Sequence, residues 1–202
     1  GKSRLVHEFK LRLAERELEL LEARCASITR SVPYAPWVSM LKRWFGVGSN
    51  DGEQAACAKV RKRFENEGGA LDDSFADLCW MMSLTPEQRP PGGEEPAHHR
   101  GFEAVSRLIE RTAQRVPVVM IIEDLHWLDD ASREILEMAI ARTDTAAVMI
   151  VTTHRPDHKP NWSSNAAFTQ LRLRSLGDED ATKIVHARAG GISIKVFGGI
   201  ML

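Results

Sequence analysis

One stretch of the sequence constrains the fold more than any other: VVMIIEDLHWLDDASREIL, residues 118–136. It begins with five consecutive apolar residues, Val118–Ile122, as expected of a strand that is covered on both faces. Two acids follow, Glu123 and Asp124, and then a polar turn and an amphipathic helix. Paired carboxylates at a strand end are suited to bind a metal ion or to activate water. The alternative at this point is a buried strand that ends in solvated carboxylates.

Other apolar segments predict the neighbours of this strand. Ala147–Thr152 is a second buried strand, and Leu18–Cys25 is a candidate that two internal glutamates weaken. Leu171–Leu173 is a further candidate. Strands that alternate with helices favour a parallel sheet with helices on both faces, which binds its ligand at the carboxyl ends of the strands. We therefore predict that Val118–Glu123 and Ala147–Thr152 are adjacent or near-adjacent parallel strands.

Helices and loops follow from apolar periodicity and from proline and glycine. Two loops are expected: Ser31–Trp37, which contains two prolines, and Thr85–His98, which is rich in Pro, Gly and Glu. Helices are expected over Ser3–Arg16, Val38–Phe45, Gln54–Glu67, Leu71–Leu84, the stripe Phe102–Ile109, Ser132–Arg142 and Asp178–Arg188.

Composition restricts the class of protein. The chain has 202 residues, 43% of them hydrophobic and 27% charged, which fits one soluble α/β domain with part of a second. A net charge of −1 argues against a nucleic-acid coat or a membrane-surface protein. No apolar run approaches the ~20 residues that span a bilayer. Three well-separated cysteines and no signal-peptide pattern predict a cytoplasmic protein with reduced thiols.

The first three residues, Gly1, Lys2 and Ser3, open a predicted helix. Phosphate-binding loops of the form G-x-x-x-x-G-K-[ST] end in this way. The tripeptide alone is a weak signal, and a flexible charged terminus is the alternative. An acidic strand end later in the chain strengthens it, because P-loop ATPases combine the two elements around Mg²⁺.

At this point the chain resembles a known family. IIEDLHWLDDAS is very similar to the acidic motif of signal-transduction ATPases of the AAA+ type, which occur beside class III adenylate/guanylate cyclase domains and in large LuxR-like regulators. GKSRLVHEF resembles the end of their phosphate loop, and SVPYAPW their insert after the second strand. IVTTHRPD resembles their fourth strand, and LRLRSLGDEDATKIV the entry to their helical lid. The resemblance covers roughly residues 1–190.

The resemblance implies the site residues. Gly1, Lys2 and Ser3 would bind nucleotide, with the lysine on the β/γ-phosphates and the Ser3 hydroxyl on Mg²⁺. Glu123 and Asp124 would share metal binding and water activation, and their E-D order leaves the division between them open.

Two further residues would form the sensor of the γ-phosphate, namely Thr153 and Arg155. The alternative for Arg155 is an ordinary exposed loop arginine. His126 and Trp127 receive no chemical role, and His126 is expected to be structural rather than a metal ligand.

The implied fold is a P-loop NTPase parallel sheet with flanking helices. Residues 1–175 would form an incomplete nucleotide-binding core, and 176–202 the start of the lid with an atypical, glycine-rich tail. The family's central first strand is expected before Gly1. The chain alone is therefore expected to bind ATP weakly or not at all and not to hydrolyse it, and an N-terminally extended form is expected to bind it.

The implied function is an ATP-binding switch module in a cytoplasmic bacterial signalling protein. Its ligands would be ATP and Mg²⁺, and its partner an attached cyclase or DNA-binding output domain, with no membrane and no nucleic acid contacted by the domain itself. Two alternatives remain open: a nucleic-acid-handling ATPase module of the origin-recognition type, and an inert truncated remnant.

Overall fold

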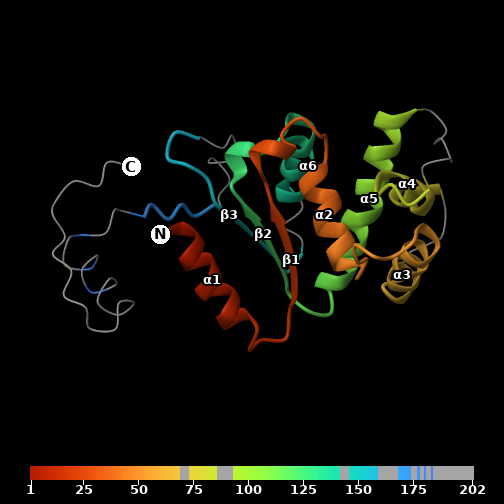
Figure 1. Ribbon diagram of the computed structural model, residues 1–202. Helices are drawn as coiled ribbons and strands as arrows, with labels where there is room; N and C mark the ends of the chain where they lie inside the picture. The colour runs from red at the N-terminus through yellow and green to blue at the C-terminus, as the bar shows by residue number, and fades with distance from the viewer. Residues whose placement is uncertain are drawn as a thin grey trace. The chain divides into compact units, whose positions relative to one another are not determined.

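In the residues that the computed structural model describes, three strands form one parallel sheet in the order β1–β2–β3 (Figure 1). The structure describes residues 1–68, 73–85, 93–141, 146–158, 168–173, 177, 180 and 183. The strands are β1 (Glu19–Arg24), β2 (Val118–Glu123) and β3 (Val148–Thr152). The prediction that the segments ending at Glu123 and Thr152 are adjacent and parallel is confirmed, because Val118 pairs with Val148 and Ile122 with Thr152.

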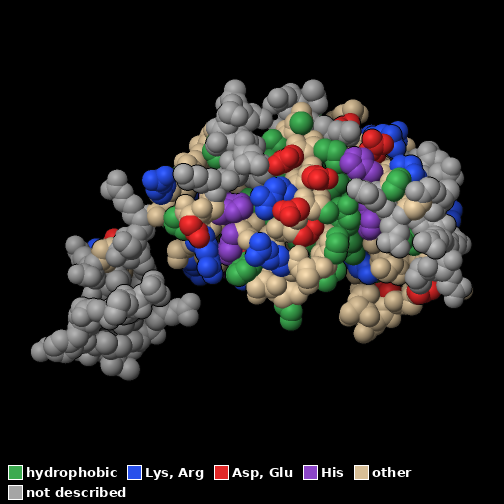
Figure 2. Space-filling view, turned by 90° about the horizontal axis from the view of Figure 1, so that it is seen from above, with side chains coloured by type: hydrophobic (Ala, Val, Ile, Leu, Met, Phe, Trp, Pro, Cys, Tyr) green, Lys and Arg blue, Asp and Glu red, His purple; other side chains and the backbone are tan. Residues whose placement is uncertain are grey.

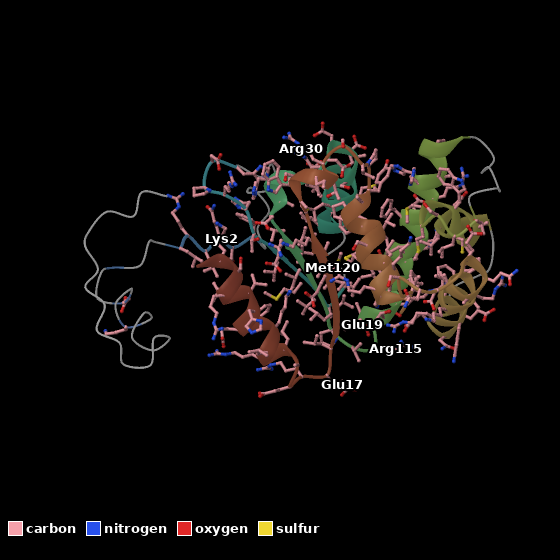
Figure 3. All side chains as sticks on the ribbon, viewed as in Figure 1. Lys2, Glu17, Glu19, Arg30, Arg115 and Met120 are labelled. Atoms are coloured by element: carbon pink, nitrogen blue, oxygen red, sulfur yellow. The ribbon has the colours of Figure 1, made fainter. Side chains whose placement is uncertain are left out.

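Strand β2 lies in the middle of the sheet because its side chains suit burial on both faces. Val118 to Ile122 are each at most 5% exposed. Met120 occupies the centre of this strand in Figure 3, which also places Glu19 and Arg115 toward the amino edge of the sheet and Arg30 at the opposite, carboxyl edge. The mixed α/β architecture with a parallel sheet agrees with the fold class predicted from the sequence.

Helices flank the sheet, and α2 packs along β1 while α4 packs along α5 (Figure 1). Short 3-10 turns, η1 and η2, follow β1 and β2. The helical segments are α1 (Lys2–Leu13), η1 (Ser27–Thr29), α2 (Ala35–Trp44), α3 (Glu53–Asn66), α4 (Asp73–Met81), α5 (Glu94–Ala113), η2 (Leu125–Trp127) and α6 (Asp130–Ala141). In the part of the chain that the structure describes, no helix combines the length and apolar character needed to cross a membrane.

Three predictions about secondary structure are wrong: two loops in part, and the candidate strand Leu171–Leu173 as a whole. Helix α2 begins at Ala35, inside the predicted loop Ser31–Trp37, because Pro36 occupies the first helical turn, where its missing N–H costs nothing. Helix α5 begins at Glu94, so the predicted loop Thr85–His98 is wrong for its last five residues. Residues 171–173 form no strand.

Two predicted segments fall largely outside the described residues. Residues 86–92 of the predicted loop lie there, as does most of the predicted helix Asp178–Arg188. Of that helix, Asp180 and Lys183 are described, and both are helical.

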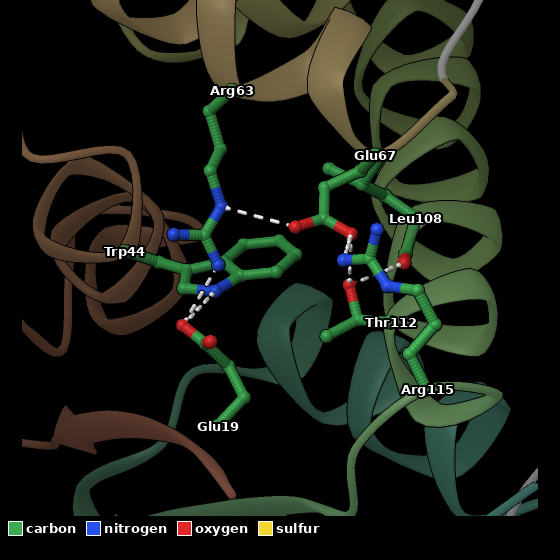
Figure 4. Close-up of polar contacts among 7 residues, drawn as sticks. All are labelled: Glu19, Trp44, Arg63, Glu67, Leu108, Thr112 and Arg115. Atoms are coloured by element: carbon green, nitrogen blue, oxygen red, sulfur yellow. Dashed lines mark hydrogen bonds and ion pairs between the residues drawn. The ribbon is translucent and has the colours of Figure 1, made fainter.

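Polar contacts attach α3 to the start of β1 and to α5 (Figure 4). Arg63 of α3 lies 2.8 Å from Glu19 Oε1 and stacks over the ring of Trp44, whose indole N–H also donates to Glu19 Oε1. Glu67, which follows α3, pairs with Arg115 and accepts a hydrogen bond from the Thr112 hydroxyl at 3.1 Å. The segment between β1 and β2 is thereby fixed at the amino edge of the sheet, and the carboxyl edge remains for the candidate site.

By internal contacts the chain divides into two compact units, Gly1–Lys10 with Thr169–Leu202, and Leu11–Phe168. The second unit contains the sheet and helices α2 to α6.

Candidate functional site

Three strand ends meet at the carboxyl edge of the sheet, because all pairings are parallel. Figure 2 looks down on this edge and shows acidic, basic and histidine side chains gathered there, beside a band of apolar side chains. Four of the residues predicted from the sequence belong to it: Glu123, Asp124, Thr153 and Arg155. The two acids are half-buried, and the strand register pairs Glu123 with Arg24 of β1.

Asp124 adopts a left-handed backbone conformation, with φ 61° and ψ 43°. Aspartate tolerates this region better than most residues do. The turn ends β2 at Glu123 and leads directly into η2. Asp124 therefore marks the point at which the chain leaves the sheet, whereas Glu123 is still the last residue of β2.

Thr153 fastens the end of β3 to the end of β2. Its hydroxyl accepts a hydrogen bond from the Asp124 N–H at 3.0 Å. Its carbonyl accepts from the Leu125 N–H at 2.8 Å, and its own N–H donates to the Ile122 carbonyl at 3.0 Å. The predicted sensor threonine and the second acid are thus held next to one another by three hydrogen bonds.

The Asp124 carboxylate has a cationic neighbour on β1. Arg24 Nε lies 3.5 Å from Asp124 Oδ2, with side chains that are 72% and 32% exposed respectively. An ion pair this exposed contributes at most about 1 kcal/mol. Arg24 therefore lends positive charge to the edge without locking the acid in place. Sequence reasoning missed this residue, because nothing in ELLEAR singles out its last position.

Arg155 lies over the face of Trp127, with 5.6 Å from the guanidinium carbon to the ring centroid. The Arg155 carbonyl accepts a hydrogen bond from the His158 N–H at 3.1 Å and lies 2.8 Å from Nδ1 of His154. Trp127 thus has a contact at the candidate site that its sequence position alone did not indicate.

Asp129 is a second residue that sequence reasoning missed. Its Oδ1 accepts a hydrogen bond from the Ser132 N–H at 2.8 Å, which caps the first turn of α6. The same oxygen lies 3.5 Å from the Tyr34 N–H, just before α2. The spacing of Asp129 and Ser132 in LDDAS is the signal that could have identified the cap.

The thiol of Cys25 is buried beneath this edge, near the carboxylates of Asp129 and Asp124. Burial raises its pKa to about 12, and the carboxylates of Asp129 and Asp124 act in the same direction. Its backbone N–H donates to the Glu123 carbonyl at 2.9 Å. Cys25 is therefore a neutral thiol at physiological pH.

Histidine side chains also lie at this edge. The rings of His154 and His158 lie 5.5 Å apart, and those of His126 and Trp127 5.0 Å apart. Burial, followed by the nearby His154 and Arg133, lowers the pKa of His158. Among the described residues, no three His, Cys, Asp or Glu side chains gather in a way that would hold a metal ion.

Gly1, Lys2 and Ser3 lie at the start of α1 in the first compact unit. The Gly1 carbonyl accepts a hydrogen bond from the Leu5 N–H at 3.2 Å, and the first helical turn includes Lys2 and Ser3 (Figure 3). All three residues are exposed. The helix predicted to begin at Ser3 is confirmed, starting one residue earlier.

The chemistry of the edge suits a hard divalent cation. Carboxylate oxygens are the protein ligands that Mg²⁺ prefers, and Mg²⁺ is commonly held by one or two carboxylates together with substrate phosphates. Glu123 and Asp124 would supply those oxygens. Arg155 adds N–H donors suited to phosphate.

Residues 1–151 match the family model described as an AAA ATPase domain. The chain belongs to the AAA ATPase domain family. This places it among nucleotide-binding P-loop ATPase modules, a class that generally binds ATP with Mg²⁺. The match includes α1, with Lys2 and Ser3, and it extends into β3.

This AAA ATPase domain is also similar to an uncharacterized protein of Rhizobium meliloti (strain 1021). The two are 28% identical over 186 residues, which make up 91% of this chain and 18% of that protein. The chain thus spans less than a fifth of the length of this relative. No solved structure matches the chain.

Proposed function

We propose that this AAA ATPase domain is the ATP-binding switch module of a bacterial signalling protein in the cytoplasm. The observation that carries the proposal is the carboxyl edge of the sheet, where the Asp124 N–H donates to the Thr153 hydroxyl and the Arg155 guanidinium lies over the Trp127 ring. The family match supports the nucleotide as ligand, since it spans both the start of α1 and the acidic strand.

Each residue has a distinct task in the proposed site. Lys2 binds the β/γ-phosphates, and the Ser3 hydroxyl together with Glu123 and Asp124 supplies oxygen ligands for Mg²⁺. Mg²⁺, when bound, neutralises charge on the phosphates. The free backbone N–H groups at the start of α1 are suited to bind a negatively charged phosphate.

The sensor residues distinguish ATP from ADP in this proposal. Thr153 keeps the end of β3 in register with the acids, and Arg155 donates hydrogen bonds to the terminal phosphate. Glu123 and Asp124 also orient water for attack on that phosphate, and the two acids share this role.

We propose an attached output domain, either a cyclase or a DNA-binding domain, as the partner that this switch controls. The resemblance of the E-D-L-H-W motif supports this assignment, and so does the much greater length of the R. meliloti relative. The domain itself would contact no membrane and no nucleic acid. Its three free cysteines agree with a reducing compartment.

Calorimetric titration of Mg-ATP into the protein at its natural length tests the nucleotide site. Lys2→Ala removes a hydrogen bond to a charged group, worth about 1.5–3 kcal/mol, and Asp124→Asn removes a negative charge from the proposed Mg²⁺ ligands. Each is therefore expected to weaken binding about ten-fold or more. Asp130→Asn is the matched control, since Asp130 follows the same edge but its side chain is fully exposed. Unchanged affinity in both test variants would overturn the proposal.

A further inference from the structure

The Arg155 guanidinium is a candidate phosphate ligand at the carboxyl edge, and it rests on an aromatic ring. Its carbon lies 5.6 Å from the centroid of the Trp127 ring, within the range of a cation–π contact. Arg155 is exposed and Trp127 is half-buried. The two come from different segments, Trp127 from η2 after β2 and Arg155 from the chain after β3.

The backbone of Arg155 is fixed independently of this stack. Its carbonyl accepts from the His158 N–H at 3.1 Å, and Thr153 two residues earlier is bound to β2. Because the backbone is held on both sides of Arg155, the main conformational freedom that remains at this position is that of the Arg155 side chain. That freedom amounts to about 2 kcal/mol for arginine.

The ring face restricts this freedom while leaving the hydrogen-bonding edge of the guanidinium available. In the part of the chain that the structure describes, no carboxylate forms an ion pair with Arg155. Stacking uses the flat face of the guanidinium, whereas its five N–H donors lie in the plane. An anion can therefore approach Arg155 while the stack persists.

We infer that Trp127 is a positioning residue, which holds the Arg155 guanidinium at the carboxyl edge for the terminal phosphate of ATP. The inference rests on the proposed function, because it needs a nucleotide at this edge. Trp127 itself does not touch the nucleotide. Tryptophan gives the strongest cation–π contact of the aromatic residues, which is the physical reason for this residue type here.

A purely structural role for Trp127 makes a different prediction. Trp127 also packs against the hydrophobic core and lies beside the His126 ring. If packing were its only role, its loss would weaken the binding of every nucleotide equally, or none. A role through Arg155 affects only a ligand that has a γ-phosphate.

The experiment compares the affinities for Mg-ATP and Mg-ADP, measured by calorimetry on the protein at its natural length. Trp127→Leu is expected to weaken ATP binding about two- to five-fold, the equivalent of an exposed cation–π contact, and to leave ADP binding unchanged. Arg155→Gln should weaken ATP binding more. The double variant should match Arg155→Gln alone, because Trp127 acts through Arg155.

Trp127→Phe keeps an aromatic ring with a weaker face, so its ATP affinity should lie between those of the wild type and Trp127→Leu. It also serves if the leucine variant does not fold. Equal losses for ATP and ADP, or a double variant that loses the sum of both effects, would overturn the inference and leave the nucleotide site intact. A wild-type protein that binds neither nucleotide would overturn the proposed function, and the inference with it.

Discussion

The backbone N–H of Asp124 donates a hydrogen bond to the hydroxyl of Thr153 over 3.0 Å, and this contact joins the end of β2 to the end of β3. It supports a left-handed turn at Asp124, together with the backbone hydrogen bonds that join Thr153 to Ile122 and Leu125 on either side of the turn. The candidate acid and the candidate sensor are therefore parts of one local structure, and a change in either one affects the geometry of the other.

Replacing Thr153 with valine keeps the shape of the side chain and removes the acceptor. The Asp124 N–H is half-buried with the rest of that residue, so Thr153→Val should lower the free energy of unfolding by about 1–3 kcal/mol. Urea denaturation followed by circular dichroism measures this. Thr153→Ser is the matched control and should lose less, since it retains the hydroxyl; equal stability of the two variants would contradict the prediction.

Removal of the α6 cap gives a second prediction. Asp129→Ala deletes the oxygen that accepts from the Ser132 N–H, so it should cost about 0.5–2 kcal/mol of stability. Asp130→Ala is the control, because the neighbouring side chain is fully exposed and forms only a 3.7 Å pair with Arg133. Its effect should stay within about 0.5 kcal/mol. A larger loss from the control than from Asp129→Ala, again in urea denaturation, would count against the cap.

Much of the fold could be predicted because the decisive segments are locally consistent. Val118–Ile122 has no polar residue to place on a solvent face, so burial on both sides is its only stable arrangement. The two helix starts that were missed share a cause. Pro36 and Pro96 both occupy first helical turns, where proline is compatible with a helix, but in the sequence they resemble loop residues.

The candidate site was predictable only where it follows a strand. Glu123, Asp124 and Thr153 come directly after or near apolar runs, so their place at the carboxyl edge follows from the parallel sheet. Arg24 and Asp129 act through contacts between distant segments, as between Asp129 and Tyr34, 95 residues apart. Such contacts depend on how helices and turns pack, which periodicity does not reveal.

A further prediction concerns Glu67, which belongs to the ion-pair cluster at the amino edge of the sheet. Its side chain is only 8% exposed, and its carboxylate contacts Thr112 and Arg115, with Arg63 at 3.5 Å (Figure 4). Glu67→Ala should lower the free energy of unfolding by about 1.5–3 kcal/mol, the value of hydrogen bonds to a charged group. Glu65→Ala, an exposed position on α3, is the control and should change stability by less than about 0.5 kcal/mol. Matching denaturation midpoints for the two would show that the cluster does not stabilise the fold.

Cys79 predicts a dependence of stability on alkaline pH. The side chain is 1% exposed, and burial raises its pKa above the ordinary 9.0, with the Cys57 thiol at 3.5 Å acting in the same direction. The folded state thus keeps a proton that the unfolded state loses, so this contribution is complete below pH 9 and disappears as pH rises further. The stability difference between wild type and Cys79→Ala should shrink by about 1 kcal/mol from about pH 8 to about pH 10. Val60→Ala, a buried apolar variant without a titratable group, should show a constant difference over that range. Urea denaturation at both pH values measures these differences. If the difference from wild type were as constant for Cys79→Ala as for Val60→Ala, Cys79 would ionise as freely in the folded protein as in the unfolded chain.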